Sequence, residues 1–224
     1  AYPQAEVFLV GGAVRDAMLG QTTKDYDFVV RGVQARHLQE FLGTVGIVNL
    51  VGRVFGVYKF IPDHGYAEFK ASGLEAFDVA LPRTEHAWGT GGYRDVEVQS
   101  DHELSIEEDL GRRDFTINAM AGECRMQNAE CRIDRIVDPF GGMKDIEAKV
   151  MRAVGNPKER FEEDYTRMLR GLRFACELGF TIAPATLEAL KQVMPRINDA
   201  RRELAKLSSV RAQSLALREF VAPR

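Results

Sequence analysis

The stretch Gly11-Gly12-Ala13-Val14-Arg15-Asp16 decides the interpretation of the whole chain. It follows the apolar run Val7–Val10, which is typical of a β-strand, and it opens a helix-forming run that ends at Gly20. Glycine lets a backbone approach a phosphate closely, and the free N–H groups of a helix N-terminus favour anions. Arg15 adds a charged fork for phosphate oxygens. We therefore predict that this turn binds phosphate, the alternative being a plain strand-to-helix turn in which Arg15 pairs with a nearby acid.

Asp25-Tyr26-Asp27 follows this stretch and begins a β-rich run that reaches Val30. Side chains alternate between the two faces of a strand, so we expect both carboxylates to project to the same side. Two like charges so close repel each other unless a cation lies between them, and hard oxygen ligands suit Mg²⁺. A D-x-D pair is common by chance, but one that follows a phosphate-binding turn is not. We therefore predict that Asp25 and Asp27 are catalytic and bind Mg²⁺.

Asp78 is a polar residue within Ala76–Leu81, an otherwise apolar run that predicts another strand. Two interpretations of its side chain stay open. Asp78 is either a third catalytic carboxylate of a two-metal site, which activates the attacking hydroxyl and steadies the leaving pyrophosphate, or one outward residue of an alternating strand.

Two further segments of the first half concern secondary structure alone. Val54–Ile61 is typical of a strand, and the turn-forming residues 62–65 follow it. Residues 86–103 are polar, contain Gly89, Gly91 and Gly92, and show little periodicity. We expect this segment to be an irregular, mobile loop.

The second half has a helical pattern. Asn156-Pro157 is typical of a helix start, and Gly179 is typical of the end of a helix that reaches about Leu178. Residues 185–193 and 199–220 predict two more helices. We therefore expect an α+β head over residues 1–140, with a small, mixed, mainly antiparallel sheet and helices, followed by an all-α neck over residues 141–224.

The segment Arg112-Arg113-Asp114-Phe115-Thr116-Ile117-Asn118 is dense in hydrogen-bonding groups. Arginine suits a triphosphate, while Asp114 and Asn118 suit ribose hydroxyls. The alternative is a charged helix start in which Asp114 is the N-terminal cap.

Asp164 and Arg167 are the first two members of a series that continues with Arg170 and Arg173. On one helix, residues three apart are neighbours, although successive steps turn by about 60° and sweep an arc around the axis. An intrahelical salt bridge on a solvated face is the alternative to a binding site.

Composition places the chain among ordinary globular proteins, with 45% hydrophobic and 28% charged residues in 224. No apolar run approaches the roughly 18 residues that span a bilayer, so we expect no membrane association. Residues 1–150 carry a net charge of −8 and residues 151–224 one of +5. This asymmetry fits a metal site followed by a helical part that handles polyanions, unless the two surfaces simply vary. The three cysteines show no ligand spacing and no even pairing, which favours a reducing, cytoplasmic compartment without structural zinc.

Together these segments resemble the class II tRNA nucleotidyltransferases, which are the bacterial and eukaryotic CCA-adding enzymes and their poly(A) polymerase relatives. Five motifs occur in the family's order, and they are G-G-A-V-R-D (11–16), D-Y-D (25–27), R-R-D-F-T-I-N-A (112–119), D-P-F-G-G (138–142) and E-D-Y-T-R-M-L-R (163–170). The resemblance covers residues 7 to about 207, and it implies a nucleotidyltransferase head and a nucleotide-selecting neck.

The resemblance implies that Asp25 and Asp27 hold the metal and that an Asp–Arg pair on the neck is the template for the incoming base. Patterns and resemblance together predict these nucleotide-binding residues: Gly11, Gly12, Arg15, Arg113, Asp114, Asn118, Asp164, Arg167, Arg170 and Arg173. Cytosine and adenine each present an amino donor beside a ring-nitrogen acceptor, which a carboxylate and a guanidinium satisfy. Guanine and uracil present the opposite order, and such a mismatch discriminates by roughly 10⁴-fold.

The implied reaction is attack of an RNA 3′-hydroxyl on the α-phosphate of CTP or ATP, which adds C and A to the 3′ end of tRNA without a template. Residues 86–94 coincide with the family's flexible loop for the switch from C to A. An A-adding enzyme or a poly(A) polymerase is the first alternative, and a truncated, non-catalytic nucleotide- or RNA-binding module is the second.

Three departures from the family pattern qualify these expectations. Tyr165-Thr166 stands between the template Asp and Arg, where small or Pro-Leu residues are usual, and residues 197–207 match the last helical motif only loosely. The family's body and tail domains are expected after the neck, so we expect this sequence to be the head and neck portion. The pattern leaves the oligomeric state open.

Overall fold

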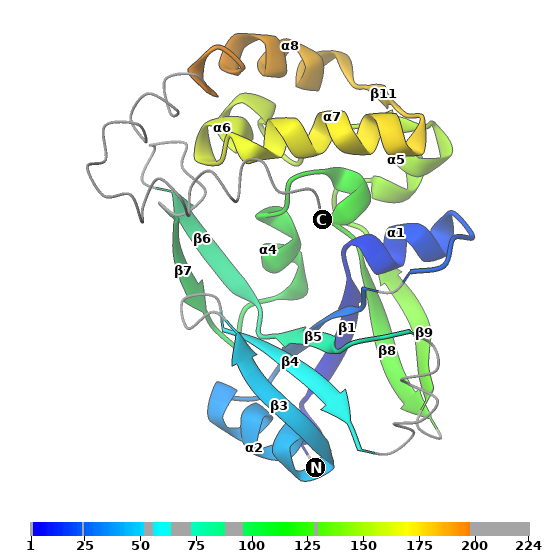
Figure 1. Ribbon diagram of the computed structural model, residues 1–224, viewed down its shortest axis with the longest axis vertical. Coiled ribbons are helices and arrows are strands. Elements are labelled where there is room, and N and C mark those ends of the chain that lie inside the picture. The colour runs from blue at the N-terminus through cyan, green and yellow to red at the C-terminus, as the bar shows by residue number, and fades with distance from the viewer. Residues whose placement is uncertain are drawn as a thin grey trace.

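The computed structural model describes residues 2–23, 25–51, 56–63, 73–87, 96–127 and 130–197. Its head contains a seven-stranded sheet with the order β3-β4-β5-β2-β1-β8-β9 (Figure 1). In that order the strands are Gly46–Val51, Val57–Pro62, Phe77–Ala80, Asp27–Arg31, Glu6–Val10, Ala121–Gln127 and Glu130–Val137. β2 and β5 pair in parallel, and the other neighbours pair antiparallel. The predicted mixed, mainly antiparallel sheet is confirmed.

Strand β1, which lies between β2 and β8, is buried on both faces because its apolar side chains alternate between two cores. Phe8 and Val10 pack with Val29 of β2 in one core. Leu9 packs with α1 (Gly12–Met18) in another core, which also takes in the neck residue Met168. The shared core joins the head to the neck.

The remaining described elements of the head are two helices, a 3₁₀ turn and a small second sheet. α2 (Ala35–Val45) packs Leu38 and Leu42 against β4 and β5. α4 (Ile106–Gly111) begins with a capping box between Ser105 and Glu108, and the 3₁₀ turn η1 (Thr116–Asn118) follows it. Beside the large sheet, β6 (Arg83–Ala87) and β7 (Val96–Ser100) pair antiparallel.

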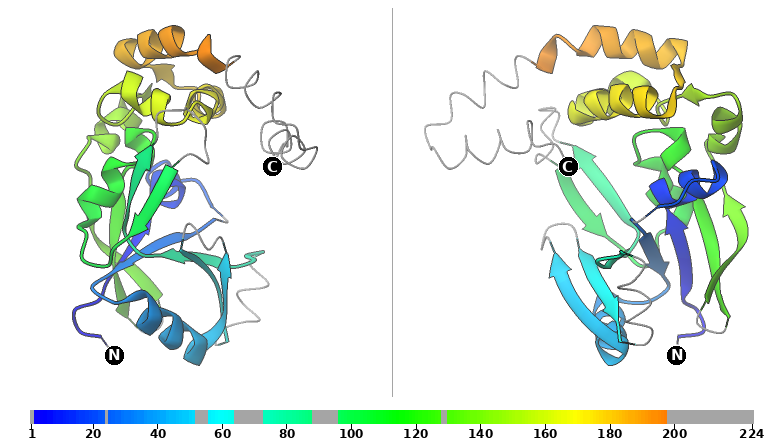
Figure 2. Two further views of the ribbon diagram at one scale, coloured as in Figure 1. Left: turned by 90° about the vertical axis from the view of Figure 1, so that its left-hand side faces the viewer. Right: turned by 45° about the vertical axis from the view of Figure 1, so that its right-hand side comes forward.

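The described part of the neck is mainly helical. Its helices are α5 (Gly142–Glu147), α6 (Pro157–Glu163), α7 (Thr166–Leu178) and α8 (Pro184–Val193). The short strands β10 (Val150–Met151) and β11 (Thr181–Ile182) pair in parallel between them. α6, α7 and α8 lie at one end of the molecule, and α2 with β3 lies at the opposite end (Figures 1 and 2).

The predicted continuous helix from residue 156 to 178 is wrong, because the chain leaves the helix at Asp164. This residue has an extended backbone (φ −151°, ψ 107°), and its carboxylate accepts a hydrogen bond from the Thr166 N–H at 2.8 Å. The carboxylate thereby ends α6 and starts α7. The predicted end of α7 at Gly179 is confirmed, with φ +66°.

The predicted irregular loop is wrong at its ends, since β6 reaches Ala87 and β7 occupies Val96–Ser100. Residues 88–95 and the predicted helix at 199–220 lie outside the described residues, as do the first residues of the predicted strand at 54–61. The remainder of that strand is confirmed as β4.

Two expectations drawn from composition also meet the structure. Cys176 is a free, exposed thiol, but Cys124 is disulfide-bonded, so the expectation of unpaired cysteines is wrong for Cys124. Within the described ranges, no helix is long and apolar enough to cross a membrane.

Candidate active site

Three charged side chains form one row across neighbouring strands of the head. Asp27 of β2 and Asp78 of β5 are Cα partners in the parallel pair, and Lys59 of β4 is the partner of Asp78 on the other side. Residues in register project to the same face of a sheet. Lys59 Nζ lies 2.6 Å from Asp78 Oδ1. The row brings Asp78 beside Asp27, as the interpretation of Asp78 as a catalytic carboxylate requires.

Asp25 lies in the loop before β2, so the prediction that both aspartates belong to one strand is wrong. Its N–H donates a hydrogen bond to Thr23 Oγ1 at 3.2 Å, a local turn that competes with strand pairing. The charge of Asp25 still reaches Asp27. The pKa of Asp27 is raised by desolvation and by the charges of Asp78 and Asp25, against the opposing charges of Arg113 and Lys59.

These carboxylates fit a hard divalent cation. Among the described residues, no group of three or more His, Cys, Asp or Glu side chains forms a ready-made metal site. Asp27 is exposed at the start of β2, so desolvation is the weaker reason for its raised pKa, and the neighbouring charges of Asp78 and Asp25 are the reason that concerns a metal. Oxygen ligands that carry an uncompensated charge are what Mg²⁺ prefers, so Asp25 and Asp27 are the residues suited to hold it.

Gly11 gives the turn after β1 its close approach to the carboxylates. Its φ of +70° favours glycine, and a Cβ at this position would lie 2.9 Å from Arg113 Nη1 and 3.8 Å from Asp27 Oδ2. The missing side chain therefore makes room for the Arg113 guanidinium beside Asp27. A phosphate next to these groups would meet a cation and the backbone of Gly12.

Arg15 is held by neighbours in the head. It donates hydrogen bonds to Asp16 at 2.8 and 2.6 Å and to Asn118 Oδ1 at 2.8 Å. The pairing of Arg15 with a nearby acid, the alternative interpretation from the sequence, is therefore present. Binding of phosphate by Arg15 stays a prediction.

Asp114 connects the head to the neck through a buried ion pair. Its carboxylate accepts hydrogen bonds from the Phe115 N–H at 2.9 Å and from Arg170 Nε at 2.8 Å. Asn118 Nδ2 lies 3.4 Å from the same carboxylate. Burial alone would raise the pKa of Asp114, but the Arg170 guanidinium outweighs it and the pKa is lowered. The capping alternative is wrong, because η1 has Phe115 at its N-cap position and no side-chain cap, and the Asp114 carboxylate accepts the N–H of its immediate neighbour. Asp114 instead orients Arg170.

Arg167 is almost fully buried, and its guanidinium is fixed by several acceptors. Nη1 lies 2.6 Å from Glu163 Oε2, and Nη2 lies 3.4 Å from Glu85 Oε2. Nη2 also donates to the carbonyl oxygen of Arg112 at 3.3 Å. The Asp164 carboxylate instead accepts from the Thr166 hydroxyl at 2.7 Å. The alternative interpretation, an intrahelical salt bridge between Asp164 and Arg167, is therefore wrong, and each group is oriented separately.

Two acids that the sequence did not single out complete this network. Glu85 accepts from Arg112 Nη1 at 2.6 Å and joins β6 to Arg167 on the neck. The Asp109 side chain is fully buried and pairs with Arg112 at 2.8 Å and Arg113 at 3.3 Å. Burial would raise the pKa of Asp109, but both arginines outweigh it and the pKa is lowered. The i,i+3 and i,i+4 spacing of Asp109 to these arginines was a usable signal; Glu85 had none.

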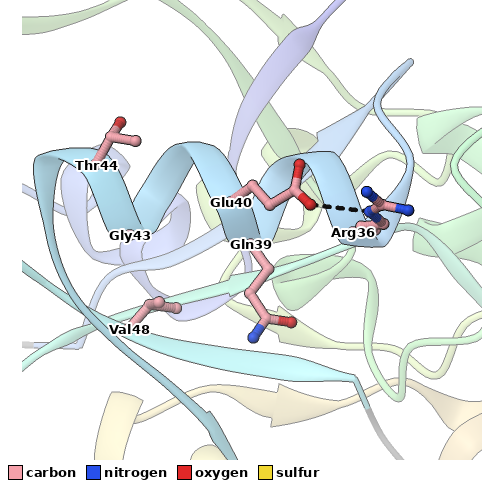
Figure 3. Close-up of a pocket in the computed structure, with 6 residues that line it drawn as sticks. All are labelled: Arg36, Gln39, Glu40, Gly43, Thr44 and Val48. Atoms are coloured by element: carbon pink, nitrogen blue, oxygen red, sulfur yellow. Dashed lines mark hydrogen bonds and ion pairs between the residues drawn. The ribbon is translucent and has the colours of Figure 1, made fainter.

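A cavity of about 500 Å³ lies on α2 and β3, at the opposite end of the head from the neck helices (Figures 1 and 3). It is lined by Arg36, Gln39, Glu40, Gly43, Thr44 and Val48. Arg36 is already paired with Glu40 at 2.8 Å, as Figure 3 shows. The cavity contains none of the predicted site residues.

Residues 7–152 match the model of a family described as the poly A polymerase head domain. The chain belongs to this family. The match begins at residue 7 of the predicted head, includes the aspartates and the arginines at residues 112 and 113, and runs on to residue 152, so it also takes in α5 and β10.

Three relatives extend the comparison into the neck. The chain is 34% identical to the CCA-adding enzyme of Bacillus subtilis (strain 168) over 98% of its own length and 50% of the relative's. It superposes with the Bacillus stearothermophilus CCA-adding enzyme in complex with CTP at a TM-score of 0.64 and 32% identity, covering 86% of this chain and 40% of that one. The Thermotoga maritima CCA-adding enzyme complexed with tRNA gives a TM-score of 0.59 and 28% identity, covering 84% and 37%. This chain therefore spans half or less of the length of these relatives.

Proposed function

We propose that this chain is the transferring and nucleotide-selecting part of a template-independent RNA nucleotidyltransferase. It adds C and A to the 3′ end of tRNA, using CTP and ATP. The observation that carries the proposal is the convergence of Asp25, Asp27 and Asp78 on one poorly compensated site beside Arg113. Relatives named CCA-adding enzymes, one of them solved with CTP, support the choice of substrates.

In this proposal the head residues bind and polarise the reacting groups. Asp25 and Asp27 hold Mg²⁺, and Asp78 adds a third negative charge beside them, so all three are catalytic. The ion supplies Lewis-acid stabilisation of the phosphoryl oxygens when it is bound. Gly11, Gly12, Arg15 and Arg113 receive the triphosphate, whose charge the two guanidinium groups compensate.

The tRNA 3′-hydroxyl attacks the α-phosphate of the bound nucleotide, a new phosphodiester bond forms, and pyrophosphate leaves. We propose that Asn118 contacts the ribose of the nucleotide. Asp114 orients the Arg170 guanidinium through their ion pair. Preorganised groups of this kind act by position, because they need no reorganisation when charge develops in the transition state.

The base is selected on the neck by Asp164 as acceptor and Arg167 as donor. The contacts of Arg167 with Glu163, Glu85 and a backbone carbonyl hold its guanidinium in one orientation. The bonds from Thr166 hold the Asp164 carboxylate in the same way. Separate anchoring supports a template role, since both groups keep their position without pairing to each other.

We assign transfer to a head at residues 1–140 and selection to a neck at residues 141–224. The core around Leu9 and Met168 contains residues of both parts, so we expect them to fold as one unit. The proposed location is the cytoplasm.

The experiment is incubation of the chain with tRNA that lacks its CCA end, with CTP alone, ATP alone, or both. We expect C from CTP alone and the full CCA end from the mixture. Incorporation of A without any C would instead support an A-adding enzyme or a poly(A) polymerase. Nucleotide binding without any incorporation would support the non-catalytic module.

A further inference from the structure

Phe174 of α7 is surrounded by three guanidinium groups. The Cζ atoms of Arg173, Arg15 and Arg170 lie 4.6, 5.3 and 5.5 Å from the centre of its ring. Arg170 and Arg173 belong to the same neck helix, whereas Arg15 comes from α1 of the head. A single aromatic ring thus brings together cations from two parts of the molecule.

The three positive charges around the ring repel each other, so favourable interactions must offset this repulsion. Carboxylates account for part of this, because Arg15 pairs with Asp16 and Arg170 pairs with Asp114. Among the acids that the structure describes, Arg173 contacts Glu177 alone, at a loose 3.8 Å. The electron-rich face of an aromatic ring attracts cations within about 6 Å, and all three arginines meet this condition.

The ring itself is anchored by the head. Phe174 packs edge-to-face on Phe115, with centroids 6.4 Å apart and an angle of 85°. Phe115 is fully buried, and Gly171 lets it approach α7, since a Cβ there would lie 2.7 Å from Phe115 Cζ. The orientation of the Phe174 ring therefore follows the buried core and not the solvent.

The arginines around this ring keep donors available. Arg170 uses Nε for Asp114, and within the described residues neither of its Nη atoms has a hydrogen-bond acceptor. Arg170 and Arg173 are each about half exposed. Their available N–H groups are suited to an anion with several oxygens, such as the polyphosphate of a nucleotide.

We propose that Phe174 is a positioning residue, whose ring holds the guanidinium groups of Arg15, Arg170 and Arg173 in place for the polyphosphate of the incoming nucleotide. The identity of that anion rests on the proposed function. Phe174 contributes no hydrogen bond to the nucleotide, and it acts through the electrostatic attraction between its ring and the arginines.

The test is a series of fluorinated phenylalanines at position 174, with one, two and three ring fluorines. Fluorination weakens the negative face of the ring while the apolar volume is nearly kept. We expect the Kd for CTP, measured by calorimetry on the 224-residue chain, to rise stepwise to about two- to fivefold. Tm should stay constant across the series. Phe174→Tyr should bind CTP like the parent, and Phe174→Leu should bind it as weakly as the trifluorinated ring.

The control is the same series at Phe180, which is buried in the core shared by head and neck and has no guanidinium contact among the described side chains. CTP binding should not change in that series. If Phe174→Leu weakens binding but fluorination at 174 does not, the ring acts by packing alone and the inference is overturned. If the unmodified chain does not bind CTP, it is the proposed function that fails.

Discussion

The negative charge of Asp27 in the head and those of Asp109 and Asp114, at what we call the head–neck boundary, meet opposite surroundings. Asp27 has a raised pKa, because desolvation and two neighbouring carboxylates outweigh Arg113 and Lys59. Asp109 and Asp114 are more deeply buried, yet their pKa values are lowered, because arginines of the protein outweigh the burial. The boundary thus contains its own cations, while the site at Asp27 is suited to one supplied from outside. We propose that transfer and selection are separated along this division.

The largest effect on activity is expected at Asp27, the carboxylate whose pKa is raised. Asp27→Asn should lower nucleotide incorporation by about 10³-fold, since several kcal/mol of transition-state stabilisation depend on a bound metal. Because the folded-state pKa of Asp27 is raised, its ionisation disfavours folding as pH rises through that pKa. The variant should therefore be no less stable than the parent at pH 7 without metal.

Single-turnover rates and thermal melts check this prediction, with Asp63→Asn, an exposed residue directly after β4, as the matched control. A variant of Asp27 that melts well below the parent would mean that the carboxylate is structural.

At the head–neck boundary, loss of a carboxylate should lower stability, in contrast to Asp27. Asp109→Asn removes the buried negative charge that Arg112 and Arg113 share, and the change should cost about 3 kcal/mol of unfolding free energy. Among the described side chains, only Arg112 then keeps an acid, Glu85. Urea denaturation measures it. Glu107→Gln, an exposed change in the same helix, should stay within about 0.5 kcal/mol. Equal midpoints for the two variants would contradict the account of the network.

The stability at low pH should also depend on the boundary carboxylate Asp114. The folded-state pKa of Asp114 is depressed, so its contribution is fully present above the unfolded value of about 3.9 and is lost as pH falls through the folded value. Asp114→Asn should cost about 2 kcal/mol at pH 7. The variant should also lose part of the decline in stability below about pH 4, as equilibrium unfolding across pH would show. An unchanged pH slope would exclude Asp114 as its source.

The smallest effect concerns Lys59, which competes with an external cation for the carboxylate row. Lys59→Met removes the ion pair with Asp78 and should tighten Mn²⁺ binding about two- to fivefold, the range of a partly exposed pair. Titration of Mn²⁺ followed by electron paramagnetic resonance gives the Kd. Lys144→Met, on the exposed face of α5, should leave it unchanged. Weaker binding in the Lys59 variant would indicate that Lys59 positions Asp78 for the metal.

Local patterns predicted the parts of the fold that local interactions determine. The strand at Val7–Val10, the helix that follows it and its end at Gly20 depend on alternation and on glycine at positive φ, which are visible in the sequence. α2 and β3 were not predicted. The signal for α2 was present in the sequence, because Leu38 and Leu42 lie one turn apart on the buried face of an amphipathic helix. In β3, by contrast, Ile47 and Leu50 are exposed, so that strand shows no clear apolar face.

The site was predicted in its residue types but not in its pairings. Asp164 was placed on a continuous helix, because nothing in the pattern reveals that its carboxylate would accept the Thr166 N–H and break the helix. The Asp114–Arg170 and Glu85–Arg167 pairs join residues 56 and 82 positions apart. Such contacts arise from the packing of the neck on the head, which no local periodicity encodes.

The separation of transfer from selection is tested most directly by comparing Asp27→Asn with Asp164→Ala in one assay. Incorporation of C, A and U into tRNA that lacks its CCA end is measured at equal nucleotide concentrations. We predict that Asp27→Asn slows all nucleotides alike and keeps their order, while Asp164→Ala raises U relative to C and A with little loss of triphosphate binding. Unchanged discrimination against UTP in Asp164→Ala, or an altered order in Asp27→Asn, would contradict the account.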